Sequence, residues 1–319
     1  MMHDNLYGLR ERPFAMTPDA RLFYASAVHA RAYAHLVYGL AQREGFVVVT
    51  GEVGAGKTTL VERLCGELDP EGFAIARLST TQVSGDDVLR LVADAFGAEP
   101  EGNKAALLRG IAAALRLGAK RHLLIVDEAQ ALPLPALEEL RMLSNMAEAG
   151  KAPLQTILLG QPQLRRTLAS PDLDQLRQRV LACYHLGGLS REETHAYVEH
   201  RLRAVGWVGR PAWDPAALDI VHRYTDGIPR RINRLCARAL LGAELEQAER
   251  LTAAMLEGTA QELEEDLGGG ALPPLAAAAQ EEFVDSLAQR VDALERLAAR
   301  RERVFGRMSE LFAERAPRR

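Results

Sequence analysis

The stretch of sequence that decides the fold reads Phe46-Val47-Val48-Val49-Thr50-Gly51-Glu52-Val53-Gly54-Ala55-Gly56-Lys57-Thr58-Thr59-Leu60. A β-branched apolar run ends in a glycine-rich turn, and a helical pattern opens directly after it. The fixed positions of the phosphate-binding loop, G-x-x-x-x-G-K-[ST], are filled by Gly51, Gly56, Lys57 and Thr58. We therefore expect a strand, a phosphate-binding loop and a helix in succession. The alternative is a glycine-rich turn without a ligand.

The chemistry of phosphate binding explains this spacing. Glycines let backbone N–H groups approach a triphosphate, because no Cβ stands in the way, and the helix N-terminus adds positive partial charge. Lys57 is placed to reach the β- and γ-phosphates, and the Thr58 hydroxyl to ligate Mg²⁺. We predict that ATP with Mg²⁺ is bound by Gly51, Glu52, Val53, Gly54, Ala55, Gly56, Lys57, Thr58 and Thr59.

Length and composition indicate an ordinary globular protein with a large core. The chain has 319 residues, of which 48% are hydrophobic and 26% charged, and a net charge of −4. This charge argues against a chain-wide surface for nucleic acid. The three cysteines are far apart and show no zinc spacing. With no signal-peptide core and no apolar run of membrane-spanning length, we expect a cytoplasmic protein, or one held peripherally at the inner membrane through a partner.

Apolar runs alternate with helical patterns downstream of the loop. The pattern predicts strands at 73–78, 122–127, 154–161 and 181–186, and helices at 86–96, 104–117, 135–149 and 172–179. Alternation of this kind is typical of a parallel three-layer α/β domain. From Ser190 onwards only helices are expected, at 192–205, 215–225, 229–245 and 252–267.

The strand predicted at 122–127 ends in Asp127-Glu128, which is the Walker B pattern at the carboxyl end of a buried parallel strand. Asp127 would hold Mg²⁺ together with Thr58, and Glu128 would orient and polarise the attacking water. The alternative is a strand followed by an acidic helix cap.

Two further polar residues follow predicted elements. Gln161 ends the strand at 154–161, where its amide could touch the γ-phosphate or the hydrolytic water; a turn residue that satisfies backbone groups is the alternative. Pro229 starts a helix, and that turn can present Arg230 to the nucleotide rather than to solvent.

The N-terminal segment is punctuated by prolines before Ser26 caps a helix that runs to Leu40. Such a segment can supply an adenine pocket, which makes Phe14, Pro18 and Tyr33 candidates, with simple core packing as the alternative. The histidines of this region form no ligand pair and are expected on the surface or with their hydrogen bonds satisfied.

The C-terminal region differs in composition from the rest. A Gly/Pro-rich linker is followed by apolar residues on alternating three- and four-residue steps from Val284 to Phe312, interrupted by Arg301. This seam predicts a coiled coil that oligomerises or binds a partner; a helix packed on its own core is the alternative. The expected domains are an N-terminal segment, an αβα core, an all-helical lid, a linker and a heptad helix, at 1–45, 46–188, 189–267, 268–280 and 281–314.

Together these motifs resemble an AAA+ ATPase, and within that family they are similar to the general secretion pathway protein A group. Closer still is the likeness to ATPases encoded beside exosortase/PEP-CTERM and exopolysaccharide export genes. The resemblance covers residues 1 to about 266 and rests on Tyr7-Gly8-Leu9, Pro13-Phe14, Thr17-Pro18-Asp19, Gly45-Phe46, Thr50-Gly51-Glu52-Val53-Gly54, Val126–Gln130, Leu137–Asn145, Leu159–Pro162 and Gly227–Asn233.

The resemblance implies a sheet of strand order 5-1-4-3-2, Mg²⁺-dependent ATP hydrolysis and assembly into a ring or partial ring. It also implies that Gln161 is the sensor on the fourth strand and Arg230 the lid sensor. An arginine finger is implied just before the fifth strand, with Arg179 our choice and Arg177 the alternative.

One departure from the group narrows the expected function. Secretion pathway protein A carries a transmembrane helix and a periplasmic peptidoglycan-binding domain, where this sequence has the linker and the heptad helix. We therefore expect an ATP-hydrolysing motor or switch that serves a membrane-associated export or exopolysaccharide system through protein contacts. The alternatives are a DNA-binding regulatory ATPase of the transposition-helper type, although nucleic acid is not the expected partner, and a nucleotide-locked scaffold.

Overall fold

A computed structural model of the chain describes residues 7–16, 22–79, 84–116, 120–145 and 154–266. The chain divides into two units, 1–260 and 261–319, and the described part of the second is only the end of one helix. The predicted linker at 268–280 and the heptad helix at 281–314 lie outside the described residues, as does Pro18.

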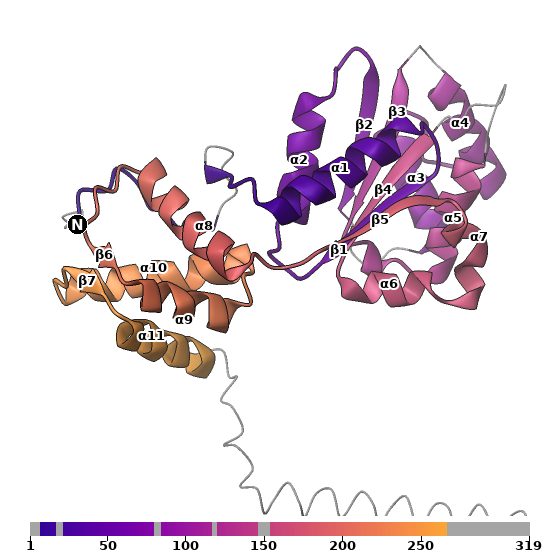
Figure 1. Ribbon diagram of the computed structural model, residues 1–319. Coiled ribbons are helices and arrows are strands. Elements are labelled where there is room, and N and C mark those ends of the chain that lie inside the picture. Colours follow the sequence, from indigo (N-terminus) through magenta and orange to yellow (C-terminus); the bar gives the residue numbers. More distant parts are fainter. Residues whose placement is uncertain (1–6, 17–21, 80–83, 117–119, 146–153, 267–319) are drawn as a thin grey trace, which may run out of the picture. The chain divides into compact units, whose positions relative to one another are not determined.

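Five parallel strands form the central sheet, in the order β2-β3-β4-β1-β5 (Figure 1). The strands are β1 (Phe46–Gly51), β2 (Phe73–Ser79), β3 (Arg121–Asp127), β4 (Leu154–Gly160) and β5 (Val180–Leu186). Every residue of β1 and β4 is buried, because both strands lie inside the sheet and are covered on both faces. Counted from the opposite edge, the order is 5-1-4-3-2, so the predicted topology is confirmed.

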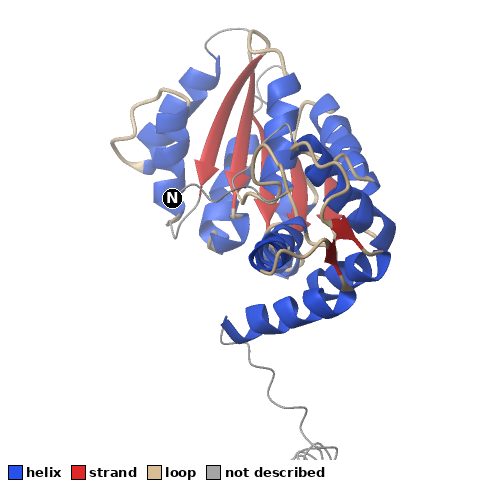
Figure 2. Ribbon diagram, turned by 90° about the vertical axis from the view of Figure 1, so that its left-hand side faces the viewer, coloured by secondary structure: helices blue, strands red, loops and turns tan. Residues whose placement is uncertain are grey.

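Helices cover both faces of this sheet (Figure 2). Alternate residues of β1 point to opposite sides: Val47 and Val49 join one hydrophobic cluster, and Phe46 and Val48 join another. The first cluster includes residues of α1 (Ala27–Ala41) and α2 (Lys57–Glu67). The second includes residues of α3 (Gly85–Ala95), α4 (Lys104–Arg116), α5 (Leu134–Ser144), α6 (Pro162–Leu168) and α7 (Asp174–Arg177). The predicted three-layer αβα architecture is therefore confirmed, with α6 as an additional helix that the sequence patterns did not indicate.

The lid consists of α8 (Arg191–Ala204), α9 (Pro215–Thr225), α10 (Pro229–Leu245) and α11 (Ala253–Asp266). The expectation of helices alone is wrong, because β6 (Ala212–Trp213) and β7 (Arg250–Leu251) pair in parallel. Two-residue strands are too short to give a periodic signal in the sequence. Among the helices of the described residues, none combines the length and the apolar character needed to cross a membrane.

The N-terminal segment, residues 7–16, packs against the lid. The Tyr7 hydroxyl donates to the Ala248 carbonyl at 2.7 Å, and the Arg10 N–H donates to the Val205 carbonyl at 2.9 Å. These contacts join residues from the two ends of the described chain, so the segment that precedes α1 belongs to the lid by its packing.

Close backbone contact marks the passage from the sheet to the lid. The Leu189 N–H donates to the Gly227 carbonyl at 2.9 Å. A Cβ built on Gly188 would lie 1.9 Å from the Asp226 carbonyl oxygen, which is backbone and cannot turn aside. Only glycine fits at position 188 without a shift of the backbone.

We predict that Gly188→Ala lowers the free energy of unfolding by about 1–3 kcal/mol, because overpacking forces the backbone apart. Thermal unfolding followed by circular dichroism measures the effect. Gly187→Ala is the matched control, since a Cβ there meets no atom within 4 Å. Equal melting temperatures for the two variants would contradict the prediction.

Candidate functional site

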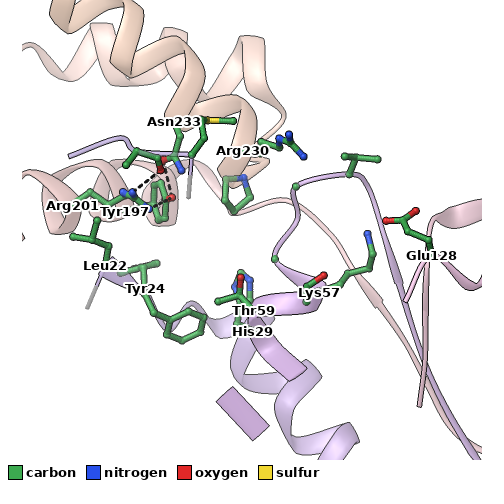
Figure 3. A pocket seen from close by; sticks show the side chains of 18 residues that line it. Leu22, Tyr24, His29, Lys57, Thr59, Glu128, Tyr197, Arg201, Arg230 and Asn233 are labelled. Atoms are coloured by element: carbon green, nitrogen blue, oxygen red, sulfur yellow. Dashed lines mark hydrogen bonds between the residues drawn. The ribbon is translucent and has the colours of Figure 1, made fainter. Parts of the chain in front are cut away.

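A cleft of about 370 Å³ is lined by the phosphate-binding loop, the N-terminal region and the lid (Figure 3). Lys57 and Glu128 lie at one end of the view, and Tyr197 and Arg201 of α8 lie at the other. The cleft therefore has a charged end next to the loop and a second end built from the lid.

The loop itself turns on glycines with left-handed backbone. Gly54 and Gly56 have φ of +84° and +100°, and Gly56 is the N-cap of α2. Lys57 Nζ donates to the carbonyls of Gly51 at 2.7 Å and Glu52 at 3.0 Å. Burial lowers the pKa of Lys57, opposed by the carboxylates of Glu128, Asp127 and Glu52. The ammonium is thus held over the loop, beside the α2 N-terminus, where an anion is favoured.

Thr58, in the first turn of α2, contacts Asp127 at the end of β3. Thr58 Oγ1 donates to Asp127 Oδ2 at 2.9 Å, while Asp127 Oδ1 accepts from the Glu128 N–H at 2.9 Å. Hydroxyl and carboxylate oxygens are the donor set that Mg²⁺ prefers in phosphate sites. Thr58 and Asp127 thus have the chemistry, and lie close enough together, to share one metal ion.

The carboxylate of Glu128 is held by two glutamines. Gln130 Nε2 donates to Glu128 Oε2 at 2.5 Å, and Gln161 Nε2 donates to the same oxygen at 3.1 Å. Gln130 Oε1 accepts in turn from the Gln161 N–H at 2.9 Å. Burial by itself raises the pKa of Glu128, but these hydrogen bonds and the charge of Lys57 outweigh it, so the pKa is lowered. Glu128 is therefore an ionised, oriented carboxylate.

Gln130 is a site residue that the sequence analysis missed. It follows Glu128 by two residues, within the 3-10 turn Ala129–Ala131. Gln130 lies within the stretch Val126–Gln130 that carries the resemblance, but an amide in a turn is common for purely structural reasons, so no role was assigned to it.

Arg230 reaches the loop from the start of α10. Its N–H donates to the Gly54 carbonyl at 3.2 Å, and a Cβ on Gly54 would lie 2.1 Å from the Arg230 Cβ. Its side chain lines the cleft (Figure 3). The lid therefore touches the phosphate-binding loop directly.

His29 supports the loop from the other side. The Ala55 carbonyl can only accept, so His29 Nε2 carries the ring proton and donates to it at 3.2 Å. In the neutral ring Nδ1 then accepts from the Ser26 hydroxyl at 2.7 Å, and the same Oγ accepts from the His29 backbone N–H at 3.2 Å. Burial lowers the pKa of His29, in keeping with a neutral ring. It is a histidine with satisfied hydrogen bonds, as expected.

The arginine finger candidates lie outside this cleft. The Arg179 carbonyl accepts from the N–H of Phe46, the first residue of β1, whereas the loop follows the last. Arg179 lines a separate hollow of about 700 Å³ with Arg141 and Asn145. Arg177 forms an exposed ion pair with Asp174 at 2.7 Å. Neither arginine is among the residues that line the cleft of its own chain.

Phe14 and Tyr33, two of the residues predicted to form an adenine pocket, do not line the cleft. Phe14 is buried with its ring centroid 6.1 Å from that of Trp213, and the Tyr33 hydroxyl donates to Glu67. Neither lines the cleft, so core or surface packing is the correct interpretation for both. The N-terminal region instead contributes Ala15, Met16, Leu22, Phe23 and Tyr24 to the cleft.

Comparison with known proteins identifies an AAA domain in the chain and a similar protein of known name. The model of the AAA domain matches residues 40–168. Over 247 residues the chain is 40% identical to general secretion pathway protein A of Aeromonas hydrophila. The aligned region covers 76% of this chain and 45% of that protein. The chain thus spans less than half the length of the curated relative it matches.

Solved structures share the fold at low sequence identity. The ORC2 protein of Aeropyrum pernix, in ADPNP–ADP complexes, has a TM-score of 0.59 at 17% identity, covering 79% of this chain and 71% of that one. Cdc6p of Pyrobaculum aerophilum has a TM-score of 0.59 at 14% identity, with 78% and 72% covered. RuvB of Thermotoga maritima, a Holliday junction branch migration motor, has a TM-score of 0.51 at 18% identity, with 75% and 72% covered.

The strand order, the loop geometry and the relative of known name agree with one another. The chain therefore has the AAA+ P-loop fold with an AAA domain at residues 40–168, and over 247 residues it is similar to general secretion pathway protein A.

Proposed function

We propose that this protein is a Mg²⁺-dependent ATPase, a motor or switch that assembles through AAA+ packing. The observation that carries the proposal is the convergence of Lys57, the Thr58–Asp127 pair and the glutamine-held Glu128 at one end of a single cleft. Each of these groups has a defined task in phosphoryl transfer to water.

The residues divide the work of hydrolysis among them. The loop N–H groups and Lys57 bind the phosphates, and Arg230 adds a positive charge from the lid. Mg²⁺ held by Thr58 and Asp127 would neutralise charge on the phosphate oxygens. Glu128 orients the attacking water and accepts its proton, because its carboxylate is ionised and aligned by hydrogen bonds. Gln161 follows β4 directly, and its side-chain amide donates to the Glu128 carboxylate and so fixes that carboxylate relative to the end of β4.

Assembly would complete the site. Arg179 lies beside the first residue of β1, so we assign it to the cleft of a neighbouring copy, where it would stabilise charge on the γ-phosphate. Arginine fingers contribute about 10³–10⁵ in rate in related phosphoryl-transfer systems. A single copy should then hydrolyse ATP poorly.

The biological setting follows from resemblance. We assign the ATPase to a membrane-associated export or exopolysaccharide system of the exosortase/PEP-CTERM type, with the predicted heptad helix at 281–314 as the contact to a protein partner. The likeness to a secretion pathway protein supports an export role. The protein would then work in the cytoplasm, at the inner membrane where that partner is present.

Lys57→Ala is expected to weaken ATP binding at least about tenfold, because a charge-assisted contact to phosphate is lost. Isothermal titration of the variant with MgATP measures it. ATP affinity equal to that of the wild type would contradict the role of Lys57.

Glu128→Gln is expected to leave ATP bound and to lower turnover by about 10²–10⁴, since the amide cannot accept the proton of water. Phosphate release and ATP binding are measured on the same preparation. Glu101→Gln is the control, with the same chemical change at an exposed position outside the cleft. Turnover at the wild-type rate would remove Glu128 from the mechanism.

Arg179→Ala is expected to abolish most turnover while its own cleft still binds ATP. Mixing it with Lys57→Ala should restore part of the activity, because one variant supplies an intact cleft and the other an intact finger. Phosphate release is followed against the mixing ratio. If Arg177→Ala gives the complementation instead, the finger is Arg177; if neither variant complements, the trans arrangement is wrong.

A further inference from the structure

Arg201 of α8 is a buried arginine at the end of the cleft that lies away from Lys57 (Figure 3). It is only 7% exposed, and within the described residues it forms no ion pair with a carboxylate. Burying a charge in this way is costly unless other groups compensate. The groups that do so indicate what the residue is for.

The guanidinium is bound to the N-terminal segment. Arg201 Nε donates to the Pro13 carbonyl at 2.6 Å, and Nη2 donates to the Ala15 carbonyl at 3.2 Å. These are alternate carbonyls of one stretch, and the planar fork of arginine spans both; an ammonium group has no such geometry. Arg201 therefore clamps residues 13–15 against the lid.

The clamp continues through the lid to the phosphate-binding loop. Arg201 Nη1 donates to the Tyr197 hydroxyl at 3.1 Å, which donates to Asn233 Oδ1 at 2.8 Å. Asn233 lies on α10 three residues after Arg230, whose N–H donates to the Gly54 carbonyl. One connected set of hydrogen bonds and helical backbone thus links the N-terminal segment to the loop.

This end of the cleft has the character of a site for a flat ring. Its walls include Ala15, Leu22, Phe23 and Tyr24, and the Tyr24 ring stands at 81° to that of Tyr197 with centroids 6.0 Å apart. Apolar and aromatic walls with a few polar groups suit the base of a nucleotide. Lys57 and Glu128 at the other end define where the phosphates would lie.

We propose that Arg201 is a positioning residue for the nucleobase: it holds the carbonyls of Pro13 and Ala15 so that the wall of the base end is built against the lid. The inference rests on the proposed ATP site. Because Arg201 acts through the wall of the base end and not on the reacting phosphate, it contributes binding that is equal in the ground state and the transition state.

The test separates the base from the phosphates of the ligand. The full chain is titrated with MgATP and with magnesium tripolyphosphate for the wild type, Arg201→Lys and Arg201→Met. Both variants are expected to weaken ATP binding about tenfold, because hydrogen bonds from a charged group are lost, and to leave tripolyphosphate binding within about twofold of the wild type. In turnover, KM for ATP should rise and kcat at saturating ATP should stay within about twofold.

Arg203→Met is the matched control. Arg203 is on the same helix, and its exposed side chain pairs with Glu199 at 2.7 Å. The affinities of Arg203→Met for MgATP and for magnesium tripolyphosphate should equal those of the wild type. If Arg201→Met does not fold, Tyr197→Phe replaces it, since this change keeps the ring and removes the hydroxyl between Arg201 and Asn233. Tyr197→Phe is expected to weaken the binding of ATP and to leave the binding of tripolyphosphate unchanged.

The two ways of failing can be told apart. Equal losses for ATP and tripolyphosphate, or no loss in either, would overturn the role of Arg201 while leaving wild-type ATP binding intact. Absence of ATP binding by the wild type would instead overturn the proposed function on which the inference rests.

Discussion

The hydrogen bond from Thr58 to Asp127 connects two strands that are not neighbours in the sheet. Thr58 follows β1 and Asp127 ends β3, with β4 lying between them. Because parallel strands end at the same edge, this order brings three carboxyl ends together: the loop after β1, the acidic pair after β3 and Gln161 after β4. Gln161 thereby reaches Glu128 from the middle strand. An order that placed β2 or β5 among these three strands would move their carboxyl ends apart.

The lid adds the second half of the cleft through a small number of close contacts. Gly188 lets the backbone at Asp226 approach, and Gly54 does the same for Arg230. At the far end, Arg201 binds the N-terminal segment. Because Gly188 and Gly54 have no Cβ, the Asp226 backbone and the Arg230 side chain can approach them closely. The third contact is made by the buried guanidinium of Arg201. The cleft is therefore shaped by contacts between segments that are distant in the sequence.

Much of the fold and the charged end of the site could be predicted from the sequence. The β-branched run at 46–49, the glycines around Gly54 and the Asp127-Glu128 pair are local signals, since each depends on neighbouring residues alone. The alternation of strands and helices indicated the layers, and resemblance supplied the strand order. The β6–β7 pair and α6 were missed because elements this short carry little periodicity. The structure places Lys57, Thr58, Asp127, Glu128 and Gln161 at the carboxyl ends of β1, β3 and β4, and Arg230 against the phosphate-binding loop. The roles assigned to these residues stay predictions.

The base end shows where sequence patterns stop. Phe14 and Tyr33 had the right chemistry for a pocket, but packing with Trp213 and Glu67 takes them out of it. Arg201 and Tyr197 lie on a polar helix and carry no motif, and only the return of residues 13–15 across the lid gives Arg201 the carbonyls that it binds. By itself the sequence indicated the phosphate chemistry, because each of its two motifs, the loop at 51–58 and the Asp127-Glu128 pair, consists of residues only a few positions apart. The tertiary structure alone decided which side chains line the remainder of the cleft, because those contacts join residues about 186 positions apart.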